Sequence, residues 1–241
     1  MYNRRKRDNH LFGRIKLIAI ISTIILVCLS YYGIIKKEIL ELPSKEIASA
    51  AVVKVSNTQA AEEETANEIE TPDWITEDFV DVNEYSRPGK KLEAVNAVVI
   101  HYTGNPGTTA AQHRHYYGEL ATTKEASVSS NFVVGIEGEV IECVPMDEVA
   151  YASNERNSDT LSIEVCHKDK TGKFTDASYE SVVKLTAFLC EKFNLGEDQI
   201  IRHYDVTGKK CPKYYVEHED EWLQLKKDVM ESVKTDSWKQ N

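Results

Sequence analysis

At 241 residues the chain is long enough for one or two domains. Its net charge of −10 is unevenly distributed, because the first 40 residues carry eight Lys/Arg and two Asp/Glu, a net +6, which leaves −16 for the remainder. Proteins that bind nucleic acid present a basic face to the phosphates, so the acidic body excludes nucleic acid as a partner.

A basic head, residues 1–16, precedes an uncharged apolar run at residues 17–35. These 19 residues are close to the ~20 that cross a bilayer as a helix, so we predict a transmembrane helix that anchors the chain in the cell membrane. The positive-inside bias places the N-terminus in the cytoplasm and the body outside, as a single-pass protein. Secretion after signal cleavage is the alternative, although the run exceeds the usual ~7–15 residues of a signal core. The only candidate cleavage sequence, Ala48-Ser49-Ala50, lies far downstream.

The next segment is rich in Ala, Glu, Ser, Thr and Lys and has little periodicity. Such a segment buries too little apolar surface to offset its ordering entropy, so we predict a flexible stalk over residues 36–73. A charged helical spacer is the alternative, and either one separates the body from the membrane. The folded domain is then expected over residues 74–235, followed by a short tail, 236–241.

The first half of the folded part predicts three strands, a helix and a turn. Residues 97–100 are apolar and mostly β-branched, which indicates a buried strand ending at His101. Residues 109–121 predict a helix that Thr108 or Thr109 can cap. Residues 131–134 and 139–144 flank a glycine-bounded turn, which is typical of a hairpin.

The second half continues the alternation of strands and helices. Residues 161–166 alternate with period two, which predicts a half-buried strand. Apolar residues at helical spacing predict a helix over 179–193 that stops at Asn194-Leu195-Gly196. Residues 200–201 predict a short strand leading to His203, and residues 217–233 a terminal amphipathic helix. Strands interleaved with helices indicate an α/β or α+β domain.

The segment Arg202–Pro212 carries the densest chemistry of the chain. It places His203, Lys209 and Cys211 close together on a turn-rich stretch, and His101 is a second candidate imidazole at the end of an earlier strand. Two nitrogens and one sulfur from distant points suit a zinc ion with one coordination position left for water.

Five cysteines do not indicate a disulfide framework. Cys28 lies in the predicted span and Cys211 in the candidate metal site, which leaves the odd number Cys143, Cys166 and Cys190. A single Cys143–Cys166 bridge and buried free thiols are both compatible with the sequence.

Three segments together resemble a known family: Val99–Thr103, Leu161–Val165 and Arg202–Pro212. They are similar, in order and spacing, to segments of the zinc-dependent N-acetylmuramoyl-L-alanine amidases, which include phage endolysins and bacterial autolysins and are related to the peptidoglycan recognition proteins. The resemblance covers residues 80–233. It implies an α/β fold with a mixed β-sheet flanked by helices, and one Zn²⁺ bound by His101, His203 and Cys211.

The resemblance also implies catalytic roles, with Glu164 as the acid/base group and Lys209 as the electrophilic helper. A carboxylate near a metal can take a proton from water and return it to a leaving amine. A fixed ammonium can stabilise the oxyanion that forms at an amide carbonyl. Lys210 stands next to Lys209 and could take its place.

Four residues near the motifs are candidates for lining the substrate groove: Tyr102, Asn131, Tyr151 and Asn157. Ordinary packing or turn positions are the alternative for each of them, because most residues of these types have no functional contact.

The function implied by the resemblance is hydrolysis of the amide between N-acetylmuramic acid and L-alanine of peptidoglycan stem peptides, in cell-wall remodelling or lysis. The expected partners are peptidoglycan and, through the N-terminal helix, the membrane; the ectodomain is expected to be monomeric. A non-catalytic peptidoglycan-binding module on the same fold is the alternative. A zinc peptidase of another kind is disfavoured because the chain has no His-Glu-x-x-His motif.

Overall fold

The structure, a computed structural model, describes residues 70–240. The predicted basic head, the predicted span at 17–35 and the stalk up to residue 69 lie outside the described residues. Within residues 70–240, no helix combines the length and the apolar character that a membrane crossing requires.

A six-stranded mixed β-sheet forms the centre of the domain, in the order β1-β4-β3-β5-β2-β6. Only β3 and β4 pair antiparallel, as the predicted hairpin; the other neighbours are parallel. The strands are β1 (Ile75–Glu77), β2 (Ala97–Tyr102), β3 (Phe132–Val134), β4 (Val140–Glu142), β5 (Thr160–Val165) and β6 (Ile200–Arg202).

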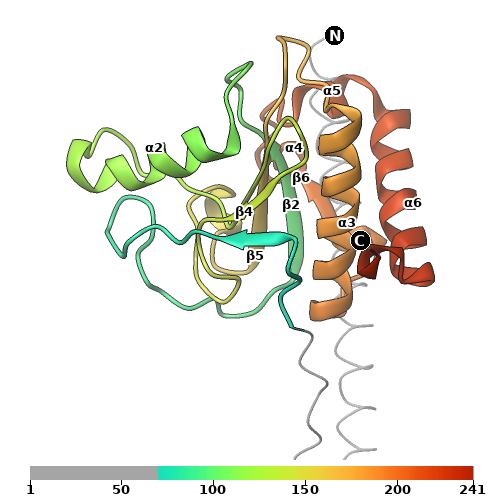
Figure 1. Cartoon of the computed structure of the whole chain (residues 1–241), viewed down its shortest axis with the longest axis horizontal. Helices are drawn as coiled ribbons and strands as arrows, with labels where there is room; N and C mark the ends of the chain where they lie inside the picture. Colours follow the sequence, from blue (N-terminus) through green and yellow to red (C-terminus); the bar gives the residue numbers. More distant parts are fainter. Residues whose placement is uncertain (1–69, 241) are drawn as a thin grey trace, which may run out of the picture. The chain divides into compact units, whose positions relative to one another are not determined.

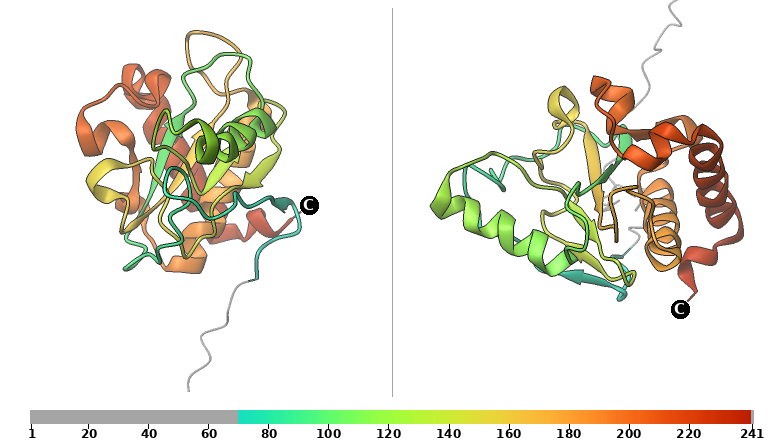
Figure 2. Two further views of the ribbon diagram at one scale, coloured as in Figure 1. Left: turned by 90° about the vertical axis from the view of Figure 1, so that its left-hand side faces the viewer. Right: turned by 90° about the horizontal axis from the view of Figure 1, so that it is seen from above.

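Helices cover both faces of the sheet, as Figures 1 and 2 show. Helix α2 (Ala110–Thr123) contacts β3 and β4 on one face, and α3 (Asp176–Phe193) contacts β2, β3 and β5 on the other, with α6 (Glu219–Thr235) packed on α3. Two short helices, α4 (His203–Thr207) and α5 (Lys213–Glu217), connect β6 to α6. Three 3₁₀ turns complete the domain: η1 (Asn154–Arg156), η2 (Glu197–Gln199) and η3 (Ser237–Lys239). The predicted mixed sheet flanked by helices is confirmed.

The helix ends follow the sequence signals that predicted them. Thr109 caps α2 through its side chain, which accepts a hydrogen bond from the backbone of Gln112. Asn194 ends α3 in the left-handed conformation, at φ 53°, where asparagine is one of the better tolerated residues. Leu195 then donates its backbone N–H to the carbonyl of Cys190, which closes the last turn.

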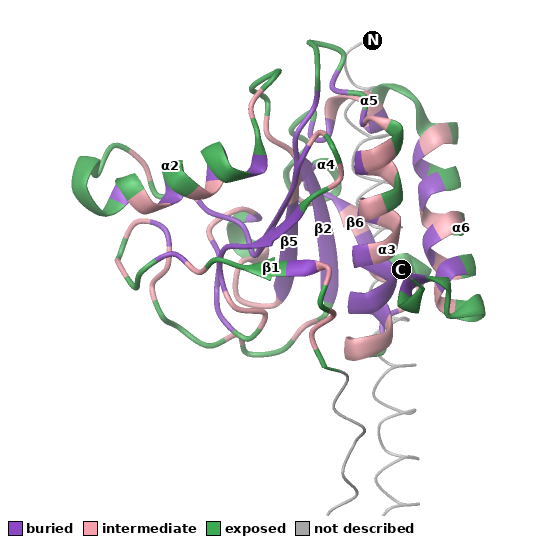
Figure 3. Ribbon diagram, viewed as in Figure 1, coloured by how far each residue is buried: buried purple, intermediate pink, exposed green. Residues whose placement is uncertain are grey.

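The core lies on both sides of the sheet, and the central strands are buried almost throughout (Figure 3). Strand β5 was predicted to be half-buried, but five of its six residues are buried. The prediction was wrong because β5 is a central parallel strand with helices on both faces, and such strands have no solvent-facing side.

The folded domain extends past the predicted end at residue 235. Trp238 in η3 is 4% exposed, its ring centroid lies 5.4 Å from that of Phe188, and its indole N–H donates to Glu191 at 2.8 Å. Trp238, in the predicted tail, therefore belongs to the core, where η3 contacts both α3 and α6.

Cys143, Cys166 and Cys190 are buried free thiols. The structure therefore contains no Cys143–Cys166 bridge. Cys143 and Cys166 lie in the smaller apolar cluster, which also contains Ala110 and Tyr117 of α2.

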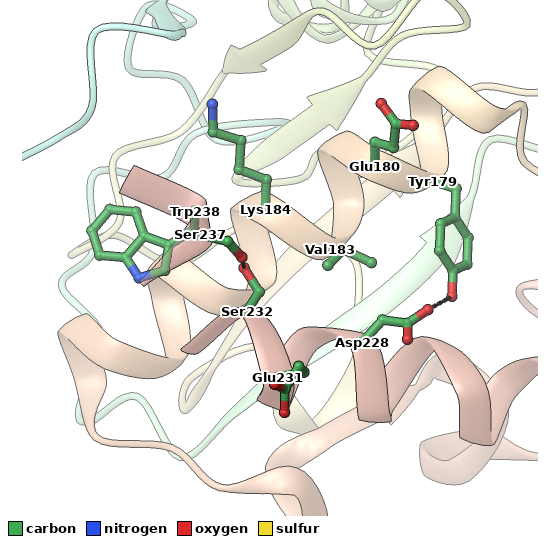
Figure 4. A pocket seen from close by; sticks show the side chains of 9 residues that line it. All are labelled: Tyr179, Glu180, Val183, Lys184, Asp228, Glu231, Ser232, Ser237 and Trp238. Atoms are coloured by element: carbon green, nitrogen blue, oxygen red, sulfur yellow. Dashed lines mark hydrogen bonds between the residues drawn. The ribbon is translucent and has the colours of Figure 1, made fainter. Parts of the chain in front are cut away.

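A cavity of about 360 Å³ lies between α3 and α6 (Figure 4). Tyr179 donates a hydrogen bond to Asp228 at one end, and Ser237 pairs with Ser232 near Trp238. None of the predicted site residues lines this cavity.

Candidate metal centre and active site

The predicted site residues gather at the carboxyl ends of three adjacent parallel strands. His101 lies near the end of β2, Glu164 near the end of β5, and His203 directly follows β6. The order β5-β2-β6 makes these strands neighbours, so side chains far apart in the sequence meet at one edge of the sheet. Ligands of open α/β sheets bind outside this edge.

His101, His203 and Cys211 form one cluster of donor atoms. One nitrogen of each ring and the sulfur of Cys211 all lie within 4.8 Å of one another, and all three side chains are buried. Sγ of Cys211 is 3.8 Å from Nδ1 of His101, and the two imidazole centroids are 4.7 Å apart. The three residues therefore make a candidate metal site.

The loop that carries Cys211 is folded back onto α4 by backbone hydrogen bonds. The N–H of Tyr204 donates to the carbonyl of Cys211 at 2.9 Å, and the N–H of Gly208 donates to the carbonyl of Tyr204 at 2.8 Å. Gly208 ends α4 at φ 78°, a conformation that glycine adopts without steric cost. This tight return brings Cys211 back beside His203.

A buried arginine holds the same segment against the C-terminal helices. The guanidinium of Arg202 donates to both carboxylate oxygens of Asp205, to the carbonyl of Tyr215 and to Glu219. Because Arg202 directly precedes His203, these bonds also fix the backbone position from which the His203 side chain extends.

The chemical state of the three donors fits a divalent metal. Burial lowers the pKa of His101 and of His203, so both rings are neutral near pH 7, which is the form that binds a metal. Burial raises the pKa of the Cys211 thiol to about 12. A thiol with such a pKa becomes a ligand when a metal displaces its proton.

Glu164 lies beside this cluster. Its Oε1 is 3.9 Å from Nδ1 of His101, and its Oε2 is buried without a hydrogen-bond partner among residues 70–240. Burial raises the pKa of Glu164 to about 8, and the positive charge of Lys209 opposes that rise. An unpaired carboxyl oxygen next to a candidate metal site can carry a proton during a reaction.

Lys209 and Lys210 occupy different surroundings. Nζ of Lys210 is 3.2 Å from Glu217 in a surface salt bridge. Lys209 instead lines a hollow with His203, and its charge acts on the whole cluster. Burial is the largest cause of the lowered pKa of both histidines, and the charge of Lys209 lowers it further. For Cys211, burial raises the pKa and the charge of Lys209 opposes that rise. The geometry therefore favours Lys209 over Lys210 as the cation of the site.

Two hollows reach the site from different sides. One, of about 300 Å³, meets it at His203 and is lined by Ser127, Tyr151, Ala152, Asn154, Asn157 and Lys209. The other, of about 340 Å³, meets it at Glu164 and extends along α2, where Gln112, His113, Tyr116 and Tyr117 contribute to its wall. Of the four predicted groove residues, the structure places Tyr151 and Asn157 on a hollow.

Asn131 lies in the interior and not on a groove wall. Its side chain is completely buried, and its amide nitrogen lies within hydrogen-bond distance of the carbonyls of Val144, Pro145 and Glu148. Its amide oxygen accepts from the backbone of Ser162. Asn131 therefore connects β5 to the loop after β4, and its amide is engaged in these structural bonds.

Tyr102 contacts the residues around the candidate metal site through its ring and its backbone. Its ring stacks on His167 with centroids 5.1 Å apart, and a Cβ on Gly172 would lie 3.0 Å from the tyrosine ring. A hydrogen bond from the backbone of Tyr102 also opposes the rise in the pKa of Cys211 that burial causes.

Sequence reasoning missed three residues that the structure places at the site. Ser153 and Asn154 each contact a ring nitrogen of a cluster histidine. Tyr117 brings its hydroxyl from α2 to 3.3 Å from Ser130 and lines the hollow that contains Glu164. Ser153 and Asn154 belong to a polar turn sequence that looks like any surface turn, and only the fold brings it to the histidines.

The model of the family described as N-acetylmuramoyl-L-alanine amidase matches residues 91–214, just over half of the chain. The chain belongs to this family. The match includes every residue of the candidate site, from His101 to Cys211, so the predicted family membership is confirmed.

Named amidases are among the relatives of the chain. The N-acetylmuramoyl-L-alanine amidase CwlL of Bacillus licheniformis is 33% identical over 169 residues, which are 64% of this chain and 46% of that protein. The amidase BlyA of Bacillus subtilis (strain 168) is 33% identical over 176 residues, with the same shares of the two chains. The chain therefore spans less than half the length of these curated relatives.

Solved structures share the amidase fold. A mutant endolysin from Bacillus subtilis aligns with a TM-score of 0.55 at 23% identity and covers 64% of this chain and 97% of that one. The catalytic domain of XlyA aligns with a TM-score of 0.54 at 22% identity, over 64% of this chain and 98% of that one. These structures correspond to the described domain in fold.

Proposed function

We propose that this member of the amidase family hydrolyses the amide bond between the lactyl group of N-acetylmuramic acid and L-alanine of peptidoglycan stem peptides, with zinc as its cofactor. The observation that carries the proposal is the cluster of His101, His203 and Cys211 with Glu164 next to it. The names of the relatives state the same amidase activity for those proteins.

His101, His203 and Cys211 would hold the zinc ion. Three protein ligands are typical of catalytic zinc sites, whereas structural sites have four. A zinc ion bound there would supply Lewis-acid activation of the attacking water and of the scissile carbonyl.

Glu164 carries the proton. Its buried, unpaired Oε2 accepts a proton from the attacking water and then donates it to the amide nitrogen of L-alanine as the C–N bond breaks. The products are a free lactyl carboxylate on the sugar and a free amino group on the peptide. One side chain thus serves as base in the first half of the reaction and as acid in the second.

Lys209 stabilises the charge that develops on the carbonyl oxygen. Its ammonium group lines the hollow that contains His203, and its field already acts on all four residues of the site. A preorganised cation at this place favours the transition state over the neutral amide.

The location of the activity is also part of the proposal. The uncharged run at residues 17–35 and its basic flank support a single-pass anchor with the catalytic domain outside the cell membrane, facing the wall. Fractionation of cells that express the full chain tests this: the intact protein is expected in the membrane fraction and its domain is expected to be accessible to protease in spheroplasts. A shortened protein in the medium would support signal cleavage and contradict the anchor.

The test of the activity uses the full chain and purified cell walls. Elemental analysis is expected to find one zinc per chain, and mass spectrometry of digested walls is expected to find stem peptides with new L-alanine amino termini. Cys211→Ala is expected to lose zinc and activity together, and Glu164→Gln to lose activity alone. Absence of zinc or of released peptide from the wild type would contradict the proposal, and wall binding without release would indicate the binding module.

A further inference from the structure

One short turn contacts both histidines of the metal cluster. Nε2 of His101 lies 3.2 Å from Oγ of Ser153, and Nε2 of His203 lies 2.9 Å from Oδ1 of Asn154. His101 belongs to β2 and His203 to α4, but Ser153 and Asn154 are consecutive residues at the start of η1. The two rings are therefore held by a single local structure.

These contacts define which nitrogen of each ring is available to a metal. A carbonyl oxygen of an asparagine side chain only accepts hydrogen bonds, so the contact with His203 is satisfied by the tautomer that carries its proton on Nε2 and keeps a lone pair on Nδ1. For His101, Nδ1 is the nitrogen that faces the cluster, 3.8 Å from Sγ of Cys211, and the hydroxyl of Ser153 can accept from Nε2. Both rings are thus set to offer Nδ1.

The turn itself is held in shape by its own side chains. Oδ1 of Asn157 accepts the backbone N–H of Ala152 at 3.1 Å and that of Ser153 at 2.6 Å. Asn154 has a φ of 54°, in the left-handed region that asparagine tolerates better than most residues. Ser153 is 1% exposed, so its hydroxyl faces the interior. The turn therefore presents its two polar groups in a fixed arrangement.

We propose that Ser153 and Asn154 are positioning residues of the metal centre, which fix Nδ1 as the ligating atom of His101 and His203 and hold both rings at one separation, while Asn157 maintains the turn. The inference rests on the proposed function, because it takes the two histidines as metal ligands. Partners of this kind orient metal-bound imidazoles, and their loss weakens metal binding by about 10–100-fold.

The left-handed conformation of Asn154 allows a clean substitution. Asn154→Gly removes the amide and keeps the backbone, because glycine adopts a φ of 54° without strain. Asn154→Asp keeps an acceptor at the same place and serves as the rescue variant. Ser153→Ala removes the buried hydroxyl. Ser127→Ala is the matched control, because Ser127 lines the same hollow as Asn154.

The experiment measures zinc affinity and ring tautomers in the full chain. Competition with a chromophoric chelator is expected to show about 10–100-fold weaker zinc binding for Asn154→Gly and Ser153→Ala, with Asn154→Asp and Ser127→Ala within about threefold of the wild type. Long-range ¹H–¹⁵N spectra of the zinc-free wild type are expected to show His203 protonated at Nε2, and those of Asn154→Gly a mixture of tautomers.

Other roles for the turn give different results. A purely structural role lowers the melting temperature of the variants and leaves zinc affinity and tautomers unchanged. If the turn instead contacts the substrate, the variants have a higher KM than the wild type and an unchanged zinc affinity. Either pattern overturns the inference and leaves the proposed function intact. A wild type that binds no zinc overturns the proposed function itself, and the inference with it.

Discussion

Glu164 and His101 are direct neighbours across the pairing of β5 with β2, and Oε1 of the first lies 3.9 Å from Nδ1 of the second. Because both residues stand on paired central strands, the hydrogen bonds of the sheet set their separation. Side chains on rigid strands hold a reactive geometry better than side chains on loops. The carboxyl proposed to carry the proton and the imidazole proposed to bind the metal are therefore held together by one strand pairing.

Replacement of Glu164 separates its chemical role from metal binding. Glu164→Gln keeps the shape of the side chain and removes its ability to exchange a proton, so kcat is expected to fall by about 10²–10⁴-fold. Bound zinc is expected to stay at one per chain, measured by elemental analysis beside the rate of release from wall fragments. Glu137→Gln, at an exposed site, is the control. A rate within tenfold of the wild type would show that another group moves the proton.

The two adjacent lysines are a matched pair. Lys209→Met is expected to lower kcat by about 10–100-fold, somewhat less than the 10²–10³-fold of a typical oxyanion donor, because Lys209 is exposed. Lys210→Met loses only a surface salt bridge to Glu217 and is expected to keep its rate within about twofold. Steady-state rates on soluble wall fragments measure both. The reverse order of effects would assign the role to Lys210.

Metal removal is expected to destabilise the folded domain. A ligand that binds only the folded state stabilises it by about 4 kcal/mol at a thousand times its dissociation constant. A strong chelator should therefore lower the melting temperature of the wild type, and added zinc should restore it. Cys211→Ser, which lacks one donor, should show little response to either. An equal response of both proteins would place the stabilising metal elsewhere.

Glu142 predicts a pH dependence of stability that is independent of the active site. Burial raises the pKa of this carboxyl from 4.5 to about 7, and its Oε2 has no hydrogen-bond partner among the described residues. Between these two pH values the folded state binds more protons than the unfolded state, so the free energy of unfolding falls as the pH rises. The full penalty, about 3 kcal/mol, is present above pH 7.

Urea unfolding of Glu142→Gln tests this dependence. Between pH 5 and pH 8, the free energy of unfolding of Glu142→Gln is expected to rise relative to that of the wild type. Glu137→Gln, at an exposed site, is again the control. A difference that stays constant with pH would show that Glu142 does not titrate in this range.

Trp238 tests the extent of the folded domain. Trp238→Ala removes a buried ring from its contact with Phe188 and is expected to lower the free energy of unfolding by about 3 kcal/mol. Lys239→Ala, at the exposed next residue, is expected to change it by less than about 1 kcal/mol. Chemical denaturation measures both. If Trp238→Ala and the wild type were equally stable, η3 would not belong to the folded domain.

The sequence predicted the elements that carry the candidate site better than it predicted their surroundings. The strand before His101, the strand that leads to His203 and the helix over 179–193 all have strong local signals, and the structure contains each of them. The predicted alternation of β5 was misleading because hydrophobic period alone does not tell how many faces of a strand are covered. That information depends on strand order, which no local pattern contains.

Local sequence patterns do not predict which residues near the motifs line the candidate groove. Asn131 and Asn157 are both asparagines near a motif. Asn131 is buried between β5 and the loop after β4, whereas Asn157 holds the turn beside the histidines. Lys209 and Lys210 are adjacent in sequence, and their surroundings separate them: Lys210 pairs with Glu217, whereas Lys209 lines the hollow with His203. The contacts that decide the roles of Asn131 and Lys210 reach other segments of the fold, which no local sequence pattern reveals.

The adjacency of β5, β2 and β6 in the sheet has a consequence for when the candidate site can form during synthesis and folding. His101 and Cys211 are 110 residues apart, and Glu164 comes from a third segment, so the reactive group exists only after all three strands have paired. A growing chain synthesised as far as β5 has one histidine and the glutamate, but neither of the other two donors. The proposed hydrolytic site is therefore incomplete until the last strand of the sheet has been synthesised and paired.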